Sequence, residues 1–157
     1  ILKLKEPLIS EAIKTSVEIK SDIVSQDEKE SGIRAILNFG HTFGHGLELI
    51  GDYKEYNHGE AVALGILSAA KLSEFSSSLS EKDSQKIKSI FNKAGIITSP
   101  LSKIDPENLY TAMQSDKKKE GNKLNFIVLE KIGVAKKMKD LSKEIVVEAI
   151  KSSLSQG

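Results

Sequence analysis

The sequence contains no cysteine, and its 157 residues include only three histidines. Without cysteine, disulfide bonds and thiolate metal ligands are excluded. A metal site in this chain must therefore use histidine, carboxylate and water as ligands. The lack of disulfides agrees with a cytoplasmic location, which we expect for this protein.

Long apolar runs and clusters of one charge are also lacking. No run approaches about eighteen apolar residues, and residues 1–5 have no signal-peptide pattern, so we expect no membrane partner. Lysines and carboxylates are interspersed, and the formal net charge is +1. Because no basic stripe is present, nothing in the charge pattern favours nucleic acid as a partner.

The chain does have enough apolar material for one core, since 39% of its residues are hydrophobic. We therefore expect a single domain over residues 1–157. The sequence begins without an initiator methionine, inside the approach to a helix, and we expect it to be a fragment. The patterns predict a mainly α-helical fold of five or six helices with one short β-hairpin.

Local signals place most of these elements. Asn57 and Glu60 have the spacing of a capping box, which puts His58 at the first position of a helix. Residues 61–70 are apolar or small almost all round, which predicts a helix buried on most sides. The remaining predicted elements are a helix at 80–95 with Ile87, Ile90, Phe91 and Ala94 inside, a helix opened by Asp105-Pro106 that ends before Asp116, a hairpin of 124–129 with 134–138 turning at Gly133, and a last helix capped by Ser142.

The most informative stretch runs from residue 34 to residue 48. At about 100° per residue, five polar residues fall within about 80° of one another on a helix. They are Arg34, Asn38, His41, His45 and Glu48. An ordinary amphipathic helix with a solvated polar face is the simplest interpretation. This face, however, carries no lysine and has two of the three histidines, which favours a functional site.

Two glycines lie beside this face. Gly40 and Gly44 remove side chains where a ligand or another backbone could come close, although each glycine costs a helix up to about 1 kcal/mol relative to alanine. The third histidine, His58, follows soon after the predicted helix ends. The charged loop before the helix contains Glu30, which we expect to lie next to the polar face.

A lysine interrupts an apolar stripe near the start of the chain. Residues 8–24 carry Ile9, Ile13, Val17 and Val24 at helical spacing, and Lys20 falls on the same predicted buried face. One interpretation is a lysine whose stem packs and whose ammonium reaches water. The other is a cation at the edge of a pocket that binds an anion.

The histidines allow two metal-binding arrangements. His41 and His45 are one turn apart and could bind one ion, but Thr42 stands where an HExxH zinc protease has its glutamate, which disfavours a metalloprotease. Alternatively, one of them pairs with His58 on the metal while the other transfers protons. The residues alone do not choose between these arrangements.

Cations and an amide near the histidines indicate the substrate class. Arg34 can bind a carboxylate or phosphate as a fork, and Lys20 and a lysine of 117–119 can bind one as point charges. Asn38 offers a donor and an acceptor to a sugar hydroxyl. A metal, a free histidine and several cations favour a small, polyhydroxylated, anionic substrate.

These residues resemble a known family. The segments LNFGHTFGH at 37–45, NHGEAVA at 57–63 and Asp116-Lys-Lys, together with Lys20, Glu30 and Arg34, are similar to the C-terminal domain of 3-dehydroquinate synthase. The similarity extends over essentially the whole chain. It implies the multihelical fold of that domain, with one short hairpin.

The resemblance implies an NAD-dependent, metal-dependent enzyme that converts 3-deoxy-arabino-heptulosonate 7-phosphate to 3-dehydroquinate with loss of phosphate. Alcohol oxidation, phosphate elimination, carbonyl reduction, ring opening and aldol closure would share one site. The metal would be zinc or cobalt. The hydride would return to the substrate, so NAD would not be consumed.

The resemblance also implies roles for individual residues. His41 and His58 match the metal-binding histidines. His45 matches a proton-transfer histidine, and Glu30 matches a second acid/base position. The positions that match substrate contacts are Lys20, Arg34, Asn38 and Lys118.

The chain departs from the family in what it lacks. In the family, an N-terminal α/β domain binds most of the NAD, and a glutamate upstream of this region is the third metal ligand. We therefore expect the isolated chain to fold but to show no catalytic turnover. As partners, we expect the missing N-terminal domain and a second copy of the chain in a homodimer. The alternatives are another sugar-phosphate cyclase such as 2-deoxy-scyllo-inosose synthase, or a non-catalytic helical domain; a glycerol-type dehydrogenase is disfavoured because Arg34 and Lys20 suit phosphate.

Overall fold

The structure is a computed structural model that describes residues 6–30, 32–119 and 124–154, apart from the side chains of 116–119. Its elements follow the chain in an order that confirms a mainly α-helical fold with one hairpin. They are α1 (Leu8–Gln26), the 3-10 helix η1 (Ile33–Asn38), α2 (His41–Ile50), α3 (His58–Ser76), α4 (Glu81–Ala94), α5 (Pro106–Lys119), β1 (Asn125–Lys131), β2 (Val134–Lys139) and α6 (Lys143–Leu154).

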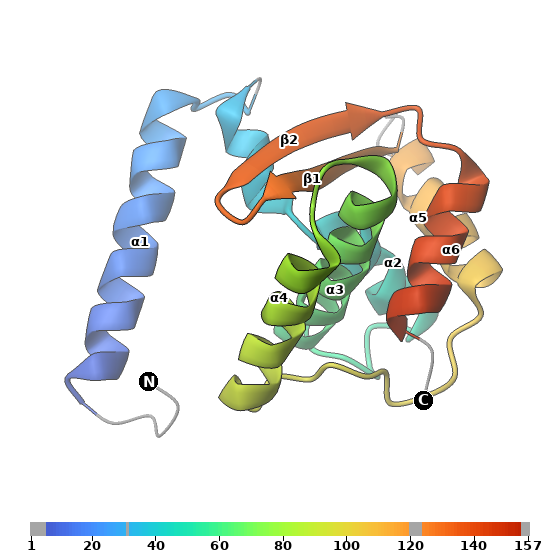
Figure 1. Cartoon of the computed structure of the whole chain (residues 1–157), viewed down its shortest axis with the longest axis horizontal. Coiled ribbons are helices and arrows are strands. Elements are labelled where there is room, and N and C mark those ends of the chain that lie inside the picture. Colours follow the sequence, from blue (N-terminus) through green and yellow to red (C-terminus); the bar gives the residue numbers. More distant parts are fainter. Residues whose placement is uncertain (1–5, 31, 120–123, 155–157) are drawn as a thin grey trace.

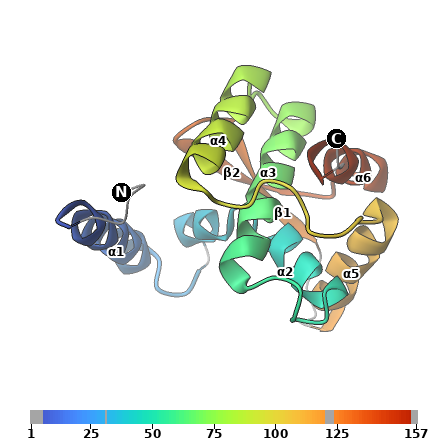
Figure 2. The same cartoon turned by 90° about the horizontal axis from the view of Figure 1, so that it is seen from below.

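Helix α3 is the centre of the fold. It contacts α2, α4, α6 and strand β1, and Figure 2 shows these elements arranged around it. Ala61, Leu64 and Leu72 are fully buried. The predicted burial of residues 61–70 on most sides is therefore confirmed, and most of the apolar core is built against this helix.

Helices α2 and α3 approach each other through glycines. Gly40 and Gly44 lie against the backbone of α3, and a Cβ on Gly44 would be 3.1 Å from the Cα of Val62. A side chain on Gly65 of α3 would in turn overlap the carbonyl oxygen of Gly40. The sequence predicts that a ligand or another backbone comes close to Gly40 and Gly44. The close approach of another backbone is confirmed.

The predicted continuous helix through residues 34–48 is wrong. The chain forms η1 up to Asn38, turns at Gly40, where φ is +82°, and begins α2 at His41. That φ is accessible to glycine at little cost and is strained for other residues. The break changes the relative direction of η1 and α2, so Arg34 and Asn38 do not continue the face that carries His41 and His45.

Helix α1 stands apart from the other helices (Figures 1 and 2), and of the described elements its main contact is η1. The predicted burial of its apolar stripe is wrong for the described residues, since Ile13 is 60% and Val17 is 62% exposed. Lys20 on this helix is exposed as well. An amphipathic pattern predicts which face of a helix is apolar, but it does not supply the surface that covers it.

The later elements largely follow their local signals. Ser80 accepts a hydrogen bond from the Asp83 backbone N–H at 3.1 Å, and Gly95 ends α4 with φ +70°. The predicted interior of α4 is wrong at Ile90, which is 52% exposed, and at Ala94, which is also exposed. Helix α5 runs to Lys119 rather than ending before Asp116.

The predicted hairpin and last helix are confirmed. Strands β1 and β2 pair antiparallel with Phe126 opposite Met138, and Gly133 has φ +90° in the turn. The buried hydroxyl of Ser73 in α3 accepts a hydrogen bond from the backbone N–H of Leu129 in β1 at 2.9 Å, which fixes the hairpin to the central helix. Among the described residues, no helix is long and apolar enough to cross a membrane.

Candidate functional site

The three histidine side chains lie together, although they come from two helices. The ring centroids of His41 and His45 in α2 are 5.8 Å apart. His58, the first residue of α3, lies with its ring centroid 5.5 Å from that of His41 and 6.1 Å from that of His45. Such a cluster of imidazoles can hold a metal ion or move protons near neutral pH.

A capping box fixes the start of α3 and with it the position of His58. The Asn57 side chain accepts a hydrogen bond from the backbone N–H of Glu60 at 3.0 Å. The Glu60 carboxylate accepts one from the backbone N–H of Asn57, also at 3.0 Å. The predicted box is confirmed, and Glu60 is engaged in capping rather than directed at the histidines.

His41 and His58 each have an oxygen atom close to their Nδ1 nitrogen. The Nδ1 atom of His41 lies 3.4 Å from the carbonyl oxygen of Phe39, and Nδ1 of His58 lies 3.0 Å from Oε1 of Glu48. A carbonyl oxygen and an ionised carboxylate can only accept, so Nδ1 is the donor in each pair. This tautomer leaves Nε2 of both rings with a lone pair for a metal ion.

The electrostatic surroundings favour neutral imidazole at His41. Burial lowers the pKa of His41 below its ordinary value, because the charged ring is less well hydrated there. The Phe39 carbonyl opposes this shift, while His45 and His58 lower the pKa further. Neutral imidazole is the form that binds metals.

One residue near the histidines was not given a role by the sequence. Among the described residues, ligand atoms of His45, Glu48 and His58 lie within 4.8 Å of one another, which is close enough to surround one ion. Glu48 was placed only on the predicted polar face. Its spacing of one helical turn from His45 was the available signal, but its contact with His58 depends on how α2 packs on α3.

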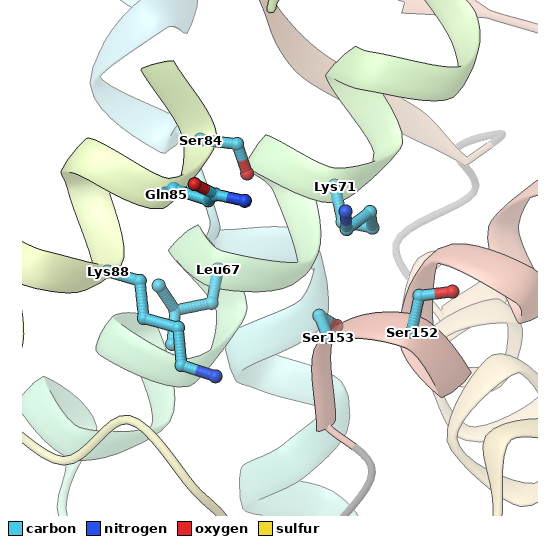
Figure 3. Close-up of a pocket in the computed structure, with 7 residues that line it drawn as sticks. All are labelled: Leu67, Lys71, Ser84, Gln85, Lys88, Ser152 and Ser153. Atoms are coloured by element: carbon cyan, nitrogen blue, oxygen red, sulfur yellow. The ribbon is translucent and has the colours of Figure 1, made fainter. Parts of the chain in front are cut away.

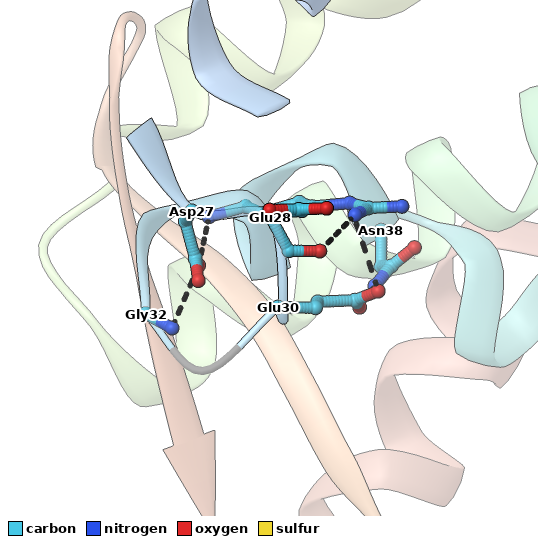
Figure 4. Close-up of polar contacts among 6 residues, drawn as sticks. Asp27, Glu28, Glu30, Gly32 and Asn38 are labelled. Atoms are coloured by element: carbon cyan, nitrogen blue, oxygen red, sulfur yellow. Dashed lines mark hydrogen bonds and ion pairs between the residues drawn. The ribbon is translucent and has the colours of Figure 1, made fainter. Parts of the chain in front are cut away.

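A second polar cluster forms around Glu30 (Figure 4). The Asn38 side chain donates a hydrogen bond to the Glu30 carboxylate at 2.5 Å, and Arg34 Nε lies 4.0 Å from it. Glu30 has φ +54°, a strained conformation for a residue other than glycine, and such strain is often found at functional sites. Glu30 is expected to lie next to the polar face of residues 34–48, and this is confirmed for the part of that face that carries Arg34 and Asn38.

The loop before η1 is held by its own hydrogen bonds. The Asp27 carboxylate accepts bonds from the backbone N–H of Gly32 at 2.7 Å and of Arg34 at 2.9 Å. The Arg34 guanidinium donates to the carbonyl oxygen of Glu28 at 2.6 Å. Arg34 is thus tied to this loop in the described structure.

A cavity of about 140 Å³ connects the Glu30 cluster to the hairpin. Its lining is mostly polar and combines residues of the loop, η1, α2 and both strands. The lining residues are Glu30, Ala35, Asn38, Thr42, Asn125, Ile127 and Lys137. Lys137 was not singled out in the sequence, because nothing local distinguishes it from the other lysines of β2.

Of the two predicted substrate lysines, the structure describes the side chain of Lys20 only, and it does not bring Lys20 to the histidines. Lys20 is exposed on α1, which lies apart from α2 and α3 (Figure 1). Lys118 belongs to the last turn of α5, but its side chain lies outside the described residues. Their predicted roles remain predictions.

Another hollow lies between α3, α4 and α6 (Figure 3). It has a volume of about 180 Å³, and it is lined by Leu67, Lys71, Ser84, Gln85, Lys88, Ser152 and Ser153. Lys71 is paired with Glu74 at 2.8 Å, and none of the predicted site residues borders this hollow. The histidine cluster and the Glu30 cluster are therefore the candidate site.

Comparison of sequences identifies related proteins. The sequence model of a family described as 3-dehydroquinate synthase C-terminal matches residues 1–119. A 3-dehydroquinate synthase of Campylobacter concisus is 41% identical over 152 residues, which are 96% of this chain and 43% of that protein. The 3-dehydroquinate synthase of Nitrosospira multiformis is 38% identical over 151 residues, 96% of this chain and 41% of that protein. The chain thus spans about two fifths of the length of these relatives.

Solved structures share the fold. A 2-epi-5-epi-valiolone synthase from Streptomyces hygroscopicus with bound NAD⁺ and Zn²⁺ matches 88% of this chain and 38% of its own, with a TM-score of 0.74 and 18% identity. A 2-deoxy-scyllo-inosose synthase in complex with carbaglucose-6-phosphate, NAD⁺ and Co²⁺ matches 90% of this chain and 40% of its own, with a TM-score of 0.73 and 27% identity.

Proposed function

Because this chain belongs to the 3-dehydroquinate synthase family, whose C-terminal part it matches, we propose that it is the metal- and substrate-binding part of such an enzyme. The whole enzyme would convert 3-deoxy-arabino-heptulosonate 7-phosphate to 3-dehydroquinate and phosphate, as a lyase of the shikimate pathway. The observation that carries the proposal is the meeting of His41, His45 and His58, with all three ring centroids within 6.1 Å of one another.

We propose His41 and His58 as ligands of a divalent metal, zinc or cobalt. The donor set fits such an ion, because both imidazoles have Nδ1 directed at an oxygen and Nε2 available. When bound, the metal would polarise oxygen atoms of the substrate as a Lewis acid. His45, whose ring centroid is 5.8 Å from that of His41 and 6.1 Å from that of His58, is proposed to transfer protons.

We propose that Glu30, Arg34 and Asn38 act on the substrate beside the histidines. Glu30 would be a second acid/base residue, and its hydrogen bond from Asn38 supports a defined position for the carboxylate. Arg34, with a side chain 33% exposed, would turn its guanidinium to a phosphate or carboxylate group. Lys20 and Lys118 are proposed to add positive charge once the rest of the enzyme is present.

The remainder of the enzyme would provide what this chain lacks. We assign no NAD-binding residue here, and propose that NAD, which supplies hydride transfer, is bound mainly by an N-terminal domain outside this sequence. That part would also supply a third protein ligand to the metal. We propose a cytoplasmic homodimer for the whole enzyme, and no turnover by the 157-residue chain alone.

A second candidate is a related sugar-phosphate cyclase. The 2-deoxy-scyllo-inosose synthase with 27% identity and a TM-score of 0.73 favours it. Identities near 40% with proteins named 3-dehydroquinate synthase favour the first candidate. Assays of the whole enzyme with the heptulosonate phosphate and with glucose 6-phosphate separate the two, because each synthase should accept only its own substrate.

Zinc titration by calorimetry tests the metal assignment. His41→Ala and His58→Ala should each weaken zinc binding strongly, whereas His45→Ala should leave most of the affinity. If both of the first two variants bind zinc like the unchanged chain, the histidines are incidental and the proposal fails. A loss at His45 and His58 without one at His41 would instead assign the metal to the His45, Glu48 and His58 group.

A further inference from the structure

The Glu48 carboxylate contacts His58 and is largely shielded from solvent. Glu48 lies in α2, the helix that carries His41 and His45, while His58 begins α3. Its side chain is 13% exposed, and Oε1 is 3.0 Å from Nδ1 of His58, whose own side chain is 59% exposed. The largely shielded carboxylate thus holds one nitrogen of a ring whose other side is open.

The same arrangement occurs at His41 with a different acceptor. There the carbonyl oxygen of Phe39 lies 3.4 Å from Nδ1. Histidines that bind metals almost always donate their second ring N–H to a carboxylate, a carbonyl oxygen or water, which fixes the tautomer and the orientation of the ring. The two histidines proposed as ligands therefore share a feature that metal ligands need.

We propose that Glu48 is a positioning residue for the metal site, a proposal that rests on the proposed function. It accepts the Nδ1 hydrogen of His58, holds the ring in the tautomer with a free Nε2, and directs Nε2 to the metal. Because Glu48 is in α2, this contact also couples the orientation of His58 to the helix of His41. Glu48 does not bind the metal in this arrangement.

Two other roles of Glu48 make different predictions. As a metal ligand, it would supply charge and an oxygen directly, and glutamine would be a poor substitute. As a partner in an exposed ion pair, it would contribute only about 0–1 kcal/mol to stability and nothing to metal binding. A positioning role predicts that Glu48→Gln weakens metal binding less than Glu48→Ala, because the amide oxygen of glutamine can still accept the Nδ1 hydrogen.

Zinc calorimetry and the visible spectrum of the Co²⁺-loaded 157-residue chain distinguish these roles. Glu48→Ala should weaken zinc binding about 10–100-fold and change the cobalt spectrum. Glu48→Gln should weaken binding less and keep the spectrum close to that of the unchanged chain. Glu74→Ala is the matched control, since Glu74 is a similarly buried carboxylate, 11% exposed and paired with Lys71, and should leave both readouts unchanged.

A double-mutant cycle tests whether Glu48 acts through His58. In the His58→Ala background, adding Glu48→Ala should cause no further loss of zinc affinity. Circular dichroism of each variant checks that it is folded, and the isosteric Glu48→Gln variant keeps the test valid if Glu48→Ala does not fold.

Three outcomes would overturn the proposal. They are unchanged zinc affinity in a folded Glu48→Ala variant, an equal loss in Glu48→Gln and Glu48→Ala, and a full Glu48→Ala effect in the absence of His58. Failure of the proposed function has a separate signature, namely that His58→Ala itself leaves zinc binding unchanged.

Discussion

Gly65 in α3 lies so close to Gly40 that any side chain on Gly65 would overlap the Gly40 carbonyl oxygen. The same Cβ would be 2.8 Å from the backbone nitrogen of Gly44. Two backbones therefore meet directly at the beginning of the helix that carries His41 and His45. This contact sets how closely His58, at the start of α3, approaches the other two histidines.

Gly65→Ala should destabilise the protein, because the methyl group meets backbone atoms that cannot move aside. We expect a loss of about 1–3 kcal/mol or more in the free energy of unfolding, measured in urea, together with weaker zinc binding. Gly59→Ala is the control, since its Cβ would meet only the Asn57 side chain at 3.4 Å. Equal stabilities of the two variants would contradict the close approach.

Ser73→Ala should remove the link between α3 and the hairpin. The Ser73 hydroxyl accepts from the Leu129 N–H at 2.9 Å, and without it that partly buried N–H loses its partner. We expect a loss of about 1–3 kcal/mol in urea unfolding. Ser76→Ala, which removes only a hydroxyl donating to the Leu72 carbonyl oxygen, should cost clearly less. A Ser76 variant as unstable as the Ser73 variant would refute this account.

Tyr56 should make stability depend on pH in the alkaline range. Burial raises the pKa of Tyr56, and the hydrogen bond from the Leu101 backbone N–H opposes this shift. In the unfolded chain tyrosine ionises near pH 10, at about its ordinary pKa, so as the pH rises the unfolded state loses this proton first. The free energy of unfolding should therefore fall above about pH 10.

Tyr56→Phe isolates this effect from the titration of lysines. The variant should lose about 1 kcal/mol at neutral pH, because the Leu101 N–H loses its acceptor. The difference in stability between the two proteins should then shrink as the pH rises above about 10. A difference that stays constant from pH 7 to 11 would show that Tyr56 does not cause the dependence.

Leu64→Ala and Ile13→Ala should differ sharply in their effect on thermal unfolding. Leu64 is fully buried in α3, and its truncation should cost about 2–5 kcal/mol. Ile13 is 60% exposed on α1, so its truncation should change stability by less than about 0.5 kcal/mol. A large cost at Ile13 would mean that α1 is covered in solution.

Interactions between near neighbours in the chain made much of the fold predictable. The reciprocal bonds of Asn57 and Glu60 begin α3, Gly95 ends α4, and Gly133 turns the hairpin. Each of these signals acts over a few residues and is the same in any surrounding structure. The sequence motif around His41, His45 and His58 also identified the family, because it needs only the order and spacing of residues.

What the sequence by itself determined was thus the helix and strand pattern, the apolar α3 and the set of histidines. Only the tertiary structure decided that the chain turns at Gly40, that Ile13 on α1 is exposed, and that Glu48 meets His58. The physical reason is that these features depend on which surfaces of different elements pack together. Helical spacing assigns a residue to a face, but a neighbouring element determines what that face touches.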